Sequence, residues 1–450
     1  MASTSSMSAP SAEFAQLERS LLSTQTPLDA RFRALFELRG LANAGSEADA
    51  HAAIDIIARG FSDDSALLKH ELAYVLGQIA NPYANASLVA VLKNTAEDPM
   101  VRHEAAEALG AISSPESLPV LQEYINDADV SVRETCELAI EKIKYDHGDE
   151  AKAARAQREA AQAARPALSA DADADAHEHA GEQDEDEAFA PIDPAPSFAS
   201  AALSGGSGSS SSSSRTAADA EAAAPSVGSL SSSPSHTRDL LTSYRTTLLA
   251  GDKLSLWERY RAMFSLRNVV HAAARASEKC QQTAAKTADA IVRQEQSQLA
   301  AEWDKVGNDA VLALADGLQD KSALFRHEIC FVFGELSHPA SIPSMIRVLA
   351  DSAEHEMVRH EAAEALGGIA EEAAESSGDQ ADAERASIDD VVKELKRWAE
   401  DMNAPRVVRE SCIVALDEMA YNNDPTQFQR VEGSGLAADV PSLPASVAAA

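Results

Sequence analysis

The sequence predicts an all-α fold, an α-solenoid of helical hairpins arranged as two pseudo-symmetric arms of four repeats that face one another. Three observations predict it. Apolar residues recur at i, i+3, i+4 and i+7, which is the spacing of an amphipathic helix. Similar segments return with a period in the thirties, which is typical of stacked helical hairpins. Alanine is abundant and aromatic residues make up only 5% of the chain, as expected where helices pack closely through small side chains.

The first arm contains four repeats whose corresponding positions are spaced 38, 33 and 31 residues apart. These positions are Phe32, His70, His103 and Glu134. In the third repeat, the sequence predicts an apolar helix that ends near Asn94, a turn that contains Pro99, and a second helix that begins near Met100. A single hairpin of this kind cannot bury its apolar stripe, so neighbouring hairpins are expected to stack into a solenoid.

The second arm is a copy of the first. The segment MVRHEAAEALG occurs twice without change, at 100–110 and at 357–367. Three further segments are matched: RFRALFELR at 31–39 with RYRAMFSLR at 259–267, LLKHELAYVLGQI at 67–79 with LFRHEICFVFGEL at 324–336, and VRETCELAI at 132–140 with VRESCIVAL at 408–416. The offset between the copies grows from 228 to 257 and then to 276 residues, which indicates insertions in the second arm.

A long low-complexity segment separates the arms. Residues 147–236 contain acidic, alanine-rich and serine-rich stretches with little apolar content, which is the composition of a disordered linker. The predicted domains are therefore an N-terminal arm at 14–146, this linker, and a C-terminal arm at 237–429. Residues 430–450 are predicted to form a flexible tail.

Charge and composition narrow the kinds of partner. The formal net charge of −34 argues against nucleic acid, whose phosphates need surfaces rich in Lys and Arg. No apolar run is long enough to span a bilayer, and the first residues do not form a secretory signal. The four cysteines show no CxxC spacing, as expected for a reduced protein. We therefore expect a protein of the cytoplasm, with the nucleus as a further compartment.

The two middle repeats of each arm carry a His-Glu pair, called a dyad below. The dyads are His70-Glu71, His103-Glu104, His327-Glu328 and His360-Glu361. In both arms the two dyads are 33 residues apart. Residues at the same phase of neighbouring repeats line up about 10 Å apart at the helix axes, so long side chains can converge. Two facing arms would thus bring four imidazoles and four carboxylates into one cleft.

This combination of side chains predicts a metal centre. Several carboxylates held close together repel one another unless cations neutralise them. Imidazole and carboxylate ligands without a thiolate suit iron, manganese or zinc, and mixed sets with open positions are typical of non-haem iron. Because the dyads form two symmetric sets, we expect two metals, each held mainly by one arm. A binuclear iron site can use dioxygen to oxidise an unactivated C–H bond.

Other interpretations of the same residues remain open. Duplication within a repeat array would keep the dyads even without a function, although the outer repeats do not have them. A further His-Glu pair at 355–356 and the His-Glu-His stretch at 177–179 lie outside the shared register, and we do not expect them to bind the functional metal. Glu107 and Glu364 follow a dyad histidine by four residues; we interpret them as surface residues or as residues beside the ligands.

Two other repeated features are interpreted as structural. Glycines follow each dyad histidine by seven residues, and we expect them to allow close helix packing rather than to make room for a substrate. They are Gly77, Gly110, Gly334 and Gly367. Two arginine pairs, Arg31 with Arg33 and Arg259 with Arg261, are expected to form ion pairs between repeats rather than a phosphate site.

These motifs resemble those of the deoxyhypusine hydroxylase family. The resemblance rests on KHELAYVLGQ, FRHEICFVFGEL and both copies of MVRHEAAEALG, and it extends over 14–146 and 237–425. The linker is longer than the family pattern requires, and the insertion EEAAESSGDQADAERAS at 371–387 also departs from it. Neither departure touches the dyads. The family consists of two arms of four HEAT-type repeats, so the resemblance implies the same solenoid.

The resemblance also implies the chemistry. The family is a non-haem di-iron monooxygenase, with two Fe²⁺ per chain and dioxygen as co-substrate. It hydroxylates the deoxyhypusine side chain of eukaryotic translation factor five-A to give hypusine. By this resemblance His70, His103 and Glu104 hold one iron, and His327, His360 and Glu361 hold the other. Glu71 and Glu328 either ligate iron or bind the substrate amines; we favour the amines, because ammonium groups need buried anions.

The expected partner is thus a protein substrate, with no nucleic acid and no membrane, and the enzyme is expected to be a monomer. Two other classes of function stay open at this point. The solenoid groove of a non-catalytic scaffold would hold an extended peptide, or a hydrolase would use two zinc ions at the dyads. Helical-repeat lyases that attach bilins are not supported, because they do not need four His-Glu pairs.

Overall fold

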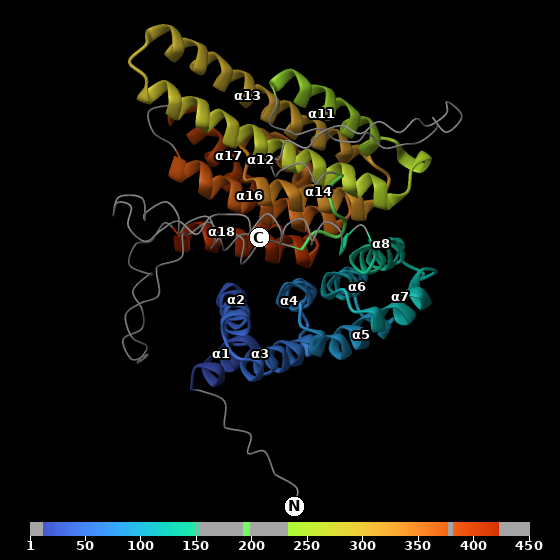
Figure 1. Ribbon diagram of the computed structural model, residues 1–450. Coiled ribbons are helices and arrows are strands. Elements are labelled where there is room, and N and C mark those ends of the chain that lie inside the picture. Colours follow the sequence, from blue (N-terminus) through green and yellow to red (C-terminus); the bar gives the residue numbers. More distant parts are fainter. Residues whose placement is uncertain (1–11, 150, 153–191, 199–232, 377–380, 423–450) are drawn as a thin grey trace, which may run out of the picture. The chain divides into compact units, whose positions relative to one another are not determined.

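The computed structural model describes residues 12–149, 151–152, 192–198, 233–376 and 381–422. Within these residues the chain forms sixteen α-helices and no strand (Figure 1), so the predicted all-α class is confirmed. The first eight are α1 (Ala12–Leu22), α2 (Leu28–Ala44), α3 (Glu47–Arg59), α4 (Ala66–Ile79), α5 (Asn85–Lys93), α6 (Pro99–Ile112), α7 (Leu118–Tyr124) and α8 (Val130–Asp146). The others are α11 (Pro234–Leu248), α12 (Leu256–Lys286), α13 (Ala290–Asp316), α14 (Ala323–Leu336), α15 (Ile342–Ala350), α16 (Glu356–Ser376), α17 (Ala381–Glu400) and α18 (Arg406–Asn422).

The contacts divide the chain into two compact units. Unit 1 comprises the described residues up to Lys144, residues 192–194, and the chain from Lys321 onward, so it holds α1 to α8 and α14 to α18. Unit 2 holds α11, α12 and α13, residues 195–198 and the described residues from Tyr145 to 152, so that the last two residues of α8 belong to it. This division follows contacts rather than repeats, so the boundaries of the two arms stay a prediction. Most of the predicted linker, the last residues of the predicted C-terminal arm from 423 onward and the predicted tail at 430–450 lie outside the described residues.

Three helices of unit 1 are built to the same plan. Ser65, Asp98 and Ser322 are the N-caps of α4, α6 and α14, and each side chain accepts a hydrogen bond from a backbone N–H of the first turn. Each helix ends fourteen residues later, where the next residue adopts a left-handed conformation. Because each cap precedes a dyad histidine by five residues, the dyads lie in the second turn of their helices.

The repeated glycines bring neighbouring inner helices together. A Cβ added at Gly77 of α4 would lie 3.0 Å from Cα of Ala108 on α6, and one at Gly110 of α6 would lie 2.9 Å from Cβ of Ala139 on α8. Gly367 of α16 approaches α18 in the same way. Only a glycine fits at such distances, so the predicted packing role is confirmed for these three. At Gly334 the nearest atoms are 3.5 Å away, which is an ordinary contact.

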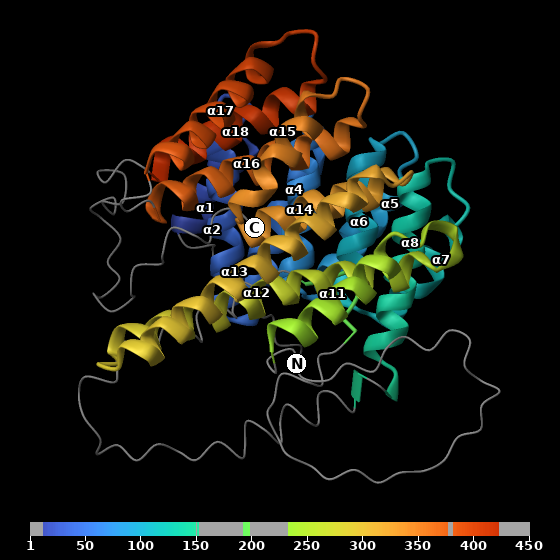
Figure 2. The same ribbon diagram turned by 90° about the horizontal axis from the view of Figure 1, so that it is seen from above.

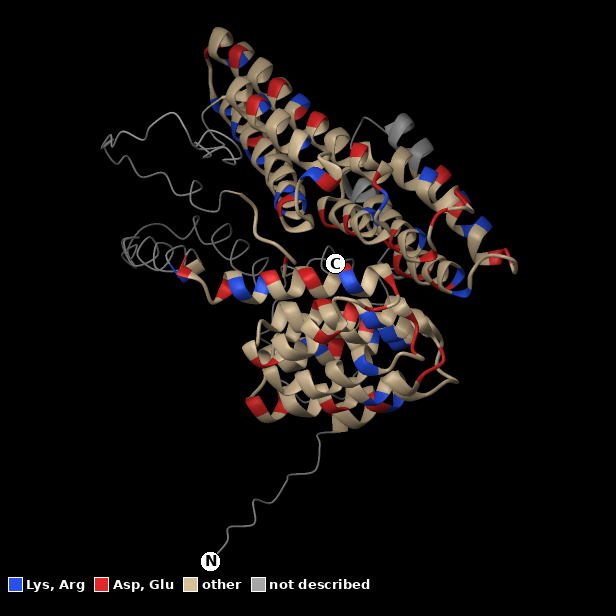
Figure 3. Ribbon diagram, turned by 90° about the vertical axis from the view of Figure 1, so that its right-hand side faces the viewer, with Lys and Arg blue, Asp and Glu red and all other residues tan. Residues whose placement is uncertain are grey.

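Unit 1 has two halves, the first made of α1 to α8 and the second of α14 to α18, and they face one another. Helix α18 contacts α2 and α4, and Figures 1 and 2 together show α14 and α16 lying over α4 and α6. Arg33 of α2 forms an ion pair with Asp417 of α18, across the two halves. Arg31 forms an ion pair with Asp63 at 2.6 Å, which confirms the expected inter-repeat pair. Acidic and basic positions are interspersed along the helices of both units (Figure 3).

Unit 2 is a smaller helical group in which α11 packs on both α12 and α13. Arg245 of α11 forms an ion pair with Asp316 of α13 at 2.7 Å. Arg259 of α12 is paired with Asp320, as expected from the sequence. In both units, none of the described helices combines the length and the hydropathy that a bilayer span requires.

Candidate metal centre

All four dyads lie within unit 1, on α4, α6, α14 and α16. None of the eight residues is more than 7% exposed, and the two histidines of the identical segments are completely buried. Long charged side chains are seldom buried unless they are paired or bind a metal. The structure buries all eight dyad residues: His70, Glu71, His103, Glu104, His327, Glu328, His360 and Glu361.

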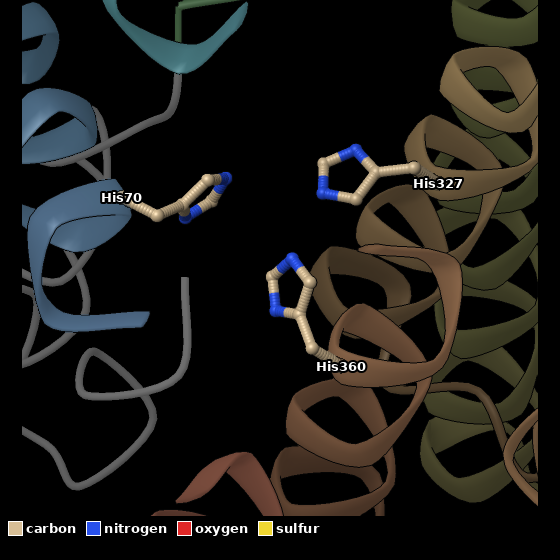
Figure 4. Close-up of side chains that lie close together, drawn as sticks. All are labelled: His70, His327 and His360. Carbon is tan, nitrogen blue, oxygen red and sulfur yellow. The ribbon is translucent and has the colours of Figure 1, made fainter. Parts of the chain in front are cut away.

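The four imidazoles converge from the two halves. Ring centroids are 5.5 Å apart for His70 and His103 within one half, and 5.3 Å apart for His327 and His360 within the other. Between the halves, the rings of His70 and His360 are 4.9 Å apart and those of His103 and His327 are 5.4 Å apart. Figure 4 shows His70 pointing across the gap at His327 and His360. The imidazoles are thus as close between the halves as within each half.

Most of the imidazole nitrogens have no hydrogen-bond partner. This holds for both nitrogens of His103, His327 and His360 and for Nε2 of His70. Nε2 of His70 lies 3.2 Å from Oε2 of Glu104, and Nε2 of His327 lies 3.2 Å from Oε2 of Glu361, but neither contact has the alignment of a hydrogen bond. Each unsatisfied buried polar group destabilises the folded state by about 1–3 kcal/mol, so this arrangement would destabilise the protein unless a ligand occupied it. Unpartnered imidazole nitrogens are the atoms that a metal ion would bind.

Burial also sets the charge state of the centre. It lowers the pKa of His103 and of His360 well below the usual range, and it lowers the pKa of His327 to about 3. Neutral imidazole is the form that binds metals. Burial raises the pKa of Glu328 and of Glu361 well above the usual range, with nearby carboxylates adding to the effect. Such carboxyl groups ionise readily only when a cation is close.

His70 is the exception among the four histidines. Burial acts to lower its pKa, but the carboxylate of Glu104 and then that of Glu71 outweigh burial and raise the pKa well above the usual range. Nδ1 of His70 lies 3.4 Å from Oε1 of Glu71. The carboxylates of both dyads on α4 and α6 therefore surround this imidazole.

Among the described residues, three sets of side chains place their donor atoms within 4.8 Å of one another. The first is His70, His103 and Glu104, which coincides with one of the predicted iron-binding sets. The second is His360, Glu361 and Glu364, so that a carboxylate takes the place expected for His327. The third joins His70, His327 and His360 across the halves. The assignment of ligands to each metal stays a prediction.

Glu364 is a residue whose role the sequence interpretation left uncertain. Its Oε1 lies 3.5 Å from Nδ1 of His360 and accepts a hydrogen bond of 3.1 Å from Ser411. Glu107 occupies the same position in the other half and lines the same cavity. Of the two interpretations given from the sequence, the structure supports residues beside the ligands and not surface residues. The signal was in the sequence, because residues four apart on a helix share a face.

The metal centre opens into a cavity of about 100 Å³. Its apolar wall contains Phe32, Phe36, Tyr74 and Phe331, and no Lys or Arg lines it among the described residues. Ile192 and Pro194, which fall within the predicted linker, also line it. Nothing in their sequence context indicated this position. His355 accepts a hydrogen bond from the backbone N–H of Met357 at the start of α16, whereas the stretch at 177–179 lies outside the described residues.

Comparison with known proteins agrees with the fold and with the dyads. A family model described as HEAT repeats matches residues 31–141 and 311–377, which confirms the predicted repeat type. Deoxyhypusine hydroxylase of Mycosarcoma maydis is 50% identical over 93% of this chain and 98% of its own length. The Homo sapiens protein of the same name is 36% identical over 92% and 93%. The solved structure of human deoxyhypusine hydroxylase in complex with glycerol matches with a TM-score of 0.55, at 34% identity over 90% of this chain and 95% of that one. The chain belongs to the deoxyhypusine hydroxylase family.

Proposed function

We propose that this protein is a deoxyhypusine monooxygenase, which hydroxylates the deoxyhypusine side chain of a substrate protein to give hypusine. The observation that carries the proposal is the convergence of four buried imidazoles, with unpartnered nitrogens, from two facing halves. Membership of the family supplies the reaction and its substrate class. A non-catalytic scaffold would gain nothing from these groups, since unsatisfied buried polar atoms destabilise the fold.

We further propose that the centre holds two Fe²⁺ ions. The donor set fits, because it consists of imidazole nitrogens and carboxyl oxygens with no thiolate among them. His70, His103 and Glu104 would hold one ion, and His327, His360 and Glu361 the other. When bound, the iron pair would supply the activation of dioxygen that oxidation of a C–H bond requires. The facing helices α4, α6, α14 and α16 hold these ligands in fixed positions and keep bulk water away from them.

The chain's own residues suit a substrate that carries amines on an alkyl stem. The carboxylates of Glu71 and Glu328 face the cavity, and Oε1 of Glu328 has no hydrogen-bond partner. Ammonium groups form strong charge-assisted hydrogen bonds with such carboxylates. The aromatic rings of Phe32, Tyr74 and Phe331 would pack on the methylene groups between the amines. We assign to Glu71 and Glu328 the role of holding the substrate amines so that a fixed carbon faces the metal centre.

The protein substrate that we propose is eukaryotic translation factor five-A. The net charge of −34 would steer a basic substrate surface toward the enzyme. We also propose that the enzyme acts as a monomer in the cytoplasm, with the nucleus as a further compartment. A complete dyad site within one chain supports the monomer, because no second copy is needed to build it.

The direct test is incubation of the iron-loaded protein with the deoxyhypusine-bearing factor, followed by mass spectrometry of the factor. The expected result is the gain of one oxygen atom on the modified side chain, and loss of that gain in His70→Ala and in His360→Ala. The matched control is His51→Ala, since His51 lies on α3 and stacks on Tyr83 away from the dyads. Absence of oxygen incorporation by the metal-loaded wild type would contradict the proposal.

A further inference from the structure

In each half of unit 1, a glutamate of the last repeat forms a hydrogen bond at the start of a dyad helix of the other half. The hydroxyl of Ser65 donates a hydrogen bond of 2.7 Å to Oε2 of Glu410, which belongs to α18. The hydroxyl of Ser322 donates one of 2.6 Å to Oε2 of Glu134, which belongs to α8. The two contacts are reciprocal, because each half supplies one serine and one glutamate. Together they tie the two halves at two separate points.

Both serines already have a structural task at these points. Ser65 is the N-cap of α4 and accepts from the N–H of Leu68 at 3.1 Å, while Ser322 is the N-cap of α14 and accepts from the N–H of Phe325 at 3.0 Å. Each hydroxyl thus caps its own helix and donates to the opposite half. Neither serine is more than 5% exposed, so water competes little for these hydrogen bonds.

The repeat register shows where the two glutamates come from. Glu134 occupies in the fourth repeat of the first arm the position that His103 occupies in the third, and Glu410 corresponds in the same way to His360. The helix position that presents an imidazole to the metal centre in the middle repeats therefore presents a carboxylate to the facing half in the last repeats. The last repeat of each arm has not merely lost a dyad; it uses the same position for a different contact.

The electrostatics favour this contact. A carboxylate near a helix N-terminus is stabilised by the partial positive charge of the unpaired N–H groups. The hydrogen bond from serine to an ionised carboxylate is also stronger than one between neutral groups. At Ser65 the arrangement is reinforced by Arg406, whose Nε donates to Glu410 at 2.6 Å and whose Nη1 donates to the carbonyl of Asp64 at 3.2 Å.

The contacts lie close to the metal centre along each helix. Ser65 precedes His70, and Ser322 precedes His327, by five residues, which is about 7.5 Å of α-helix. A shift or tilt at the start of α4 or α14 would consequently move these two histidines relative to the dyads on α6 and α16. Residues that hydrogen-bond directly to metal ligands commonly change metal affinity by about 10- to 100-fold when they are replaced, and we expect an effect of that order from groups that fix the helices carrying the ligands.

We propose that Glu134 and Glu410 are positioning residues, which form a reciprocal clasp that fixes α4 and α14 and so sets the separation of the two halves of the metal centre. The clasp itself depends only on the contacts described above. Its consequence for hydroxylation rests on the proposed function. Neither glutamate is among the residues that line the cavity, so the clasp acts through helix position rather than through the substrate.

The test compares Glu134→Ala and Glu410→Ala with Glu134→Gln and Glu410→Gln, and uses Glu137→Ala on the exposed face of α8 as the control. The first measurement is hydrogen exchange of the metal-free protein. We expect each alanine variant to speed exchange about ten-fold in the first turn of the helix that it contacts in the other half, since a charge-assisted hydrogen bond is lost. Glu410→Ala should act on α4 and Glu134→Ala on α14, and the glutamine variants should restore most of the protection because their amide oxygen still accepts.

The second measurement is iron affinity, and the third is the split between kcat and KM. We expect the alanine variants to bind iron about 10- to 100-fold more weakly and the glutamine variants to stay close to the wild type. Turnover should fall with kcat while KM is unchanged, because the substrate contacts remain. Exchange that speeds up equally in both helices, or unchanged iron affinity in both alanine variants, would overturn the clasp. If the wild type does not hydroxylate the factor, the proposed function fails, whereas exchange and iron affinity still decide the clasp.

Discussion

The two copies of MVRHEAAEALG form the same helix turns in α6 and α16, yet they meet different neighbours. Arg102 of the first copy forms two hydrogen bonds with the carboxylate of Asp127, at 2.6 and 3.1 Å. Arg359 of the second copy lies over the ring of Trp398, with its guanidinium carbon 4.2 Å from the ring centroid. Both arginines donate Nε to a carbonyl of the preceding helix at 3.0 Å. The identical sequence therefore sets the helix and the hydrogen bond from the arginine Nε to the preceding helix. The remaining contacts depend on neighbouring segments, whose sequences differ between the two arms.

The same lesson holds for α4 and α14. The pKa of His70 is raised because two carboxylates outweigh burial, whereas burial lowers the pKa of His327 to about 3. Four residues after these histidines, Tyr74 in α4 corresponds to Phe331 in α14. The hydroxyl of Tyr74 accepts a hydrogen bond of 2.7 Å from Gln78, and Phe331 has no such group. The centre is thus pseudo-symmetric in its dyads and asymmetric in its surroundings.

The largest effect on activity and on bound iron is expected when a dyad histidine is removed from either half. His103→Ala and His360→Ala should each abolish hydroxylation and should each reduce bound iron from two ions to one per chain, because each half holds one ion in the proposed assignment. Metal analysis of the purified variants and mass spectrometry of the factor check this. Retention of both ions in either variant would show that the halves do not hold the metals separately.

A smaller effect is expected at the carboxylates that face the substrate. Glu71→Gln and Glu328→Gln should keep both iron ions and raise KM by about 10- to 100-fold, since each loses a charge-assisted hydrogen bond of about 1.5–3 kcal/mol. The effect should be larger for Glu328, whose Oε1 has no partner within the protein, than for Glu71, which lies against His70. Steady-state kinetics with parallel metal analysis separate the two roles. Loss of iron with unchanged KM would assign these residues to the metals instead.

The arginines of the two identical segments should differ in their contribution to stability. Arg102→Met removes both guanidinium hydrogen bonds to the buried carboxylate of Asp127, which keeps only the backbone N–H of Asp129 as a donor among the described residues, and should cost about 3–5 kcal/mol. Arg359→Met loses a cation–π contact instead, which should cost about 0.5–2 kcal/mol. Thermal unfolding of the metal-free protein should therefore show a clearly larger drop in Tm for Arg102→Met. Equal drops would mean that the two surroundings are energetically equivalent.

The smallest effects are expected at the repeated glycines, where alanine should lower the stability of the protein in one half and raise it in the other. Gly110→Ala forces a Cβ to within 2.9 Å of Cβ of Ala139 and should destabilise the protein by about 1–3 kcal/mol. Gly334→Ala meets its nearest atoms at 3.5 Å and should stabilise α14 by up to about 1 kcal/mol through helix propensity. Urea unfolding of both variants measures the difference. A destabilised Gly334→Ala variant would show that the interface there is tighter than the structure indicates.

Much of the fold could be predicted because the repeats carry local signals. Ser65, Asp98 and Ser322 precede apolar periodic segments and are the N-caps that the structure shows. The convergence of the dyads followed from their equal phase in neighbouring repeats. The position of Glu364 beside His360 could also be predicted, because the two residues are four apart on the helix. The corresponding positions on α4 and α14 carry Tyr74 and Phe331, so the sequence did not show a repeated carboxylate there.

Other parts of the site depend on contacts between distant segments, which local patterns do not encode. Ile192 and Pro194 line the cavity although their neighbours in the sequence have the composition of a linker. The contacts of Glu134 and Glu410 were missed because the last repeats were interpreted only as lacking dyads. Their partners, Ser322 and Ser65, are 188 and 345 residues away in the chain.

The measurement that tests the account most directly is anomalous scattering at the iron edge from crystals of the iron-loaded protein. We expect two iron peaks about 3.5–4 Å apart, the spacing of two-metal centres, with one beside His70, His103 and Glu104 and the other beside His327, His360 and Glu361. A single peak bound across the halves by His70, His327 and His360, or iron bound away from the dyads, would contradict the account.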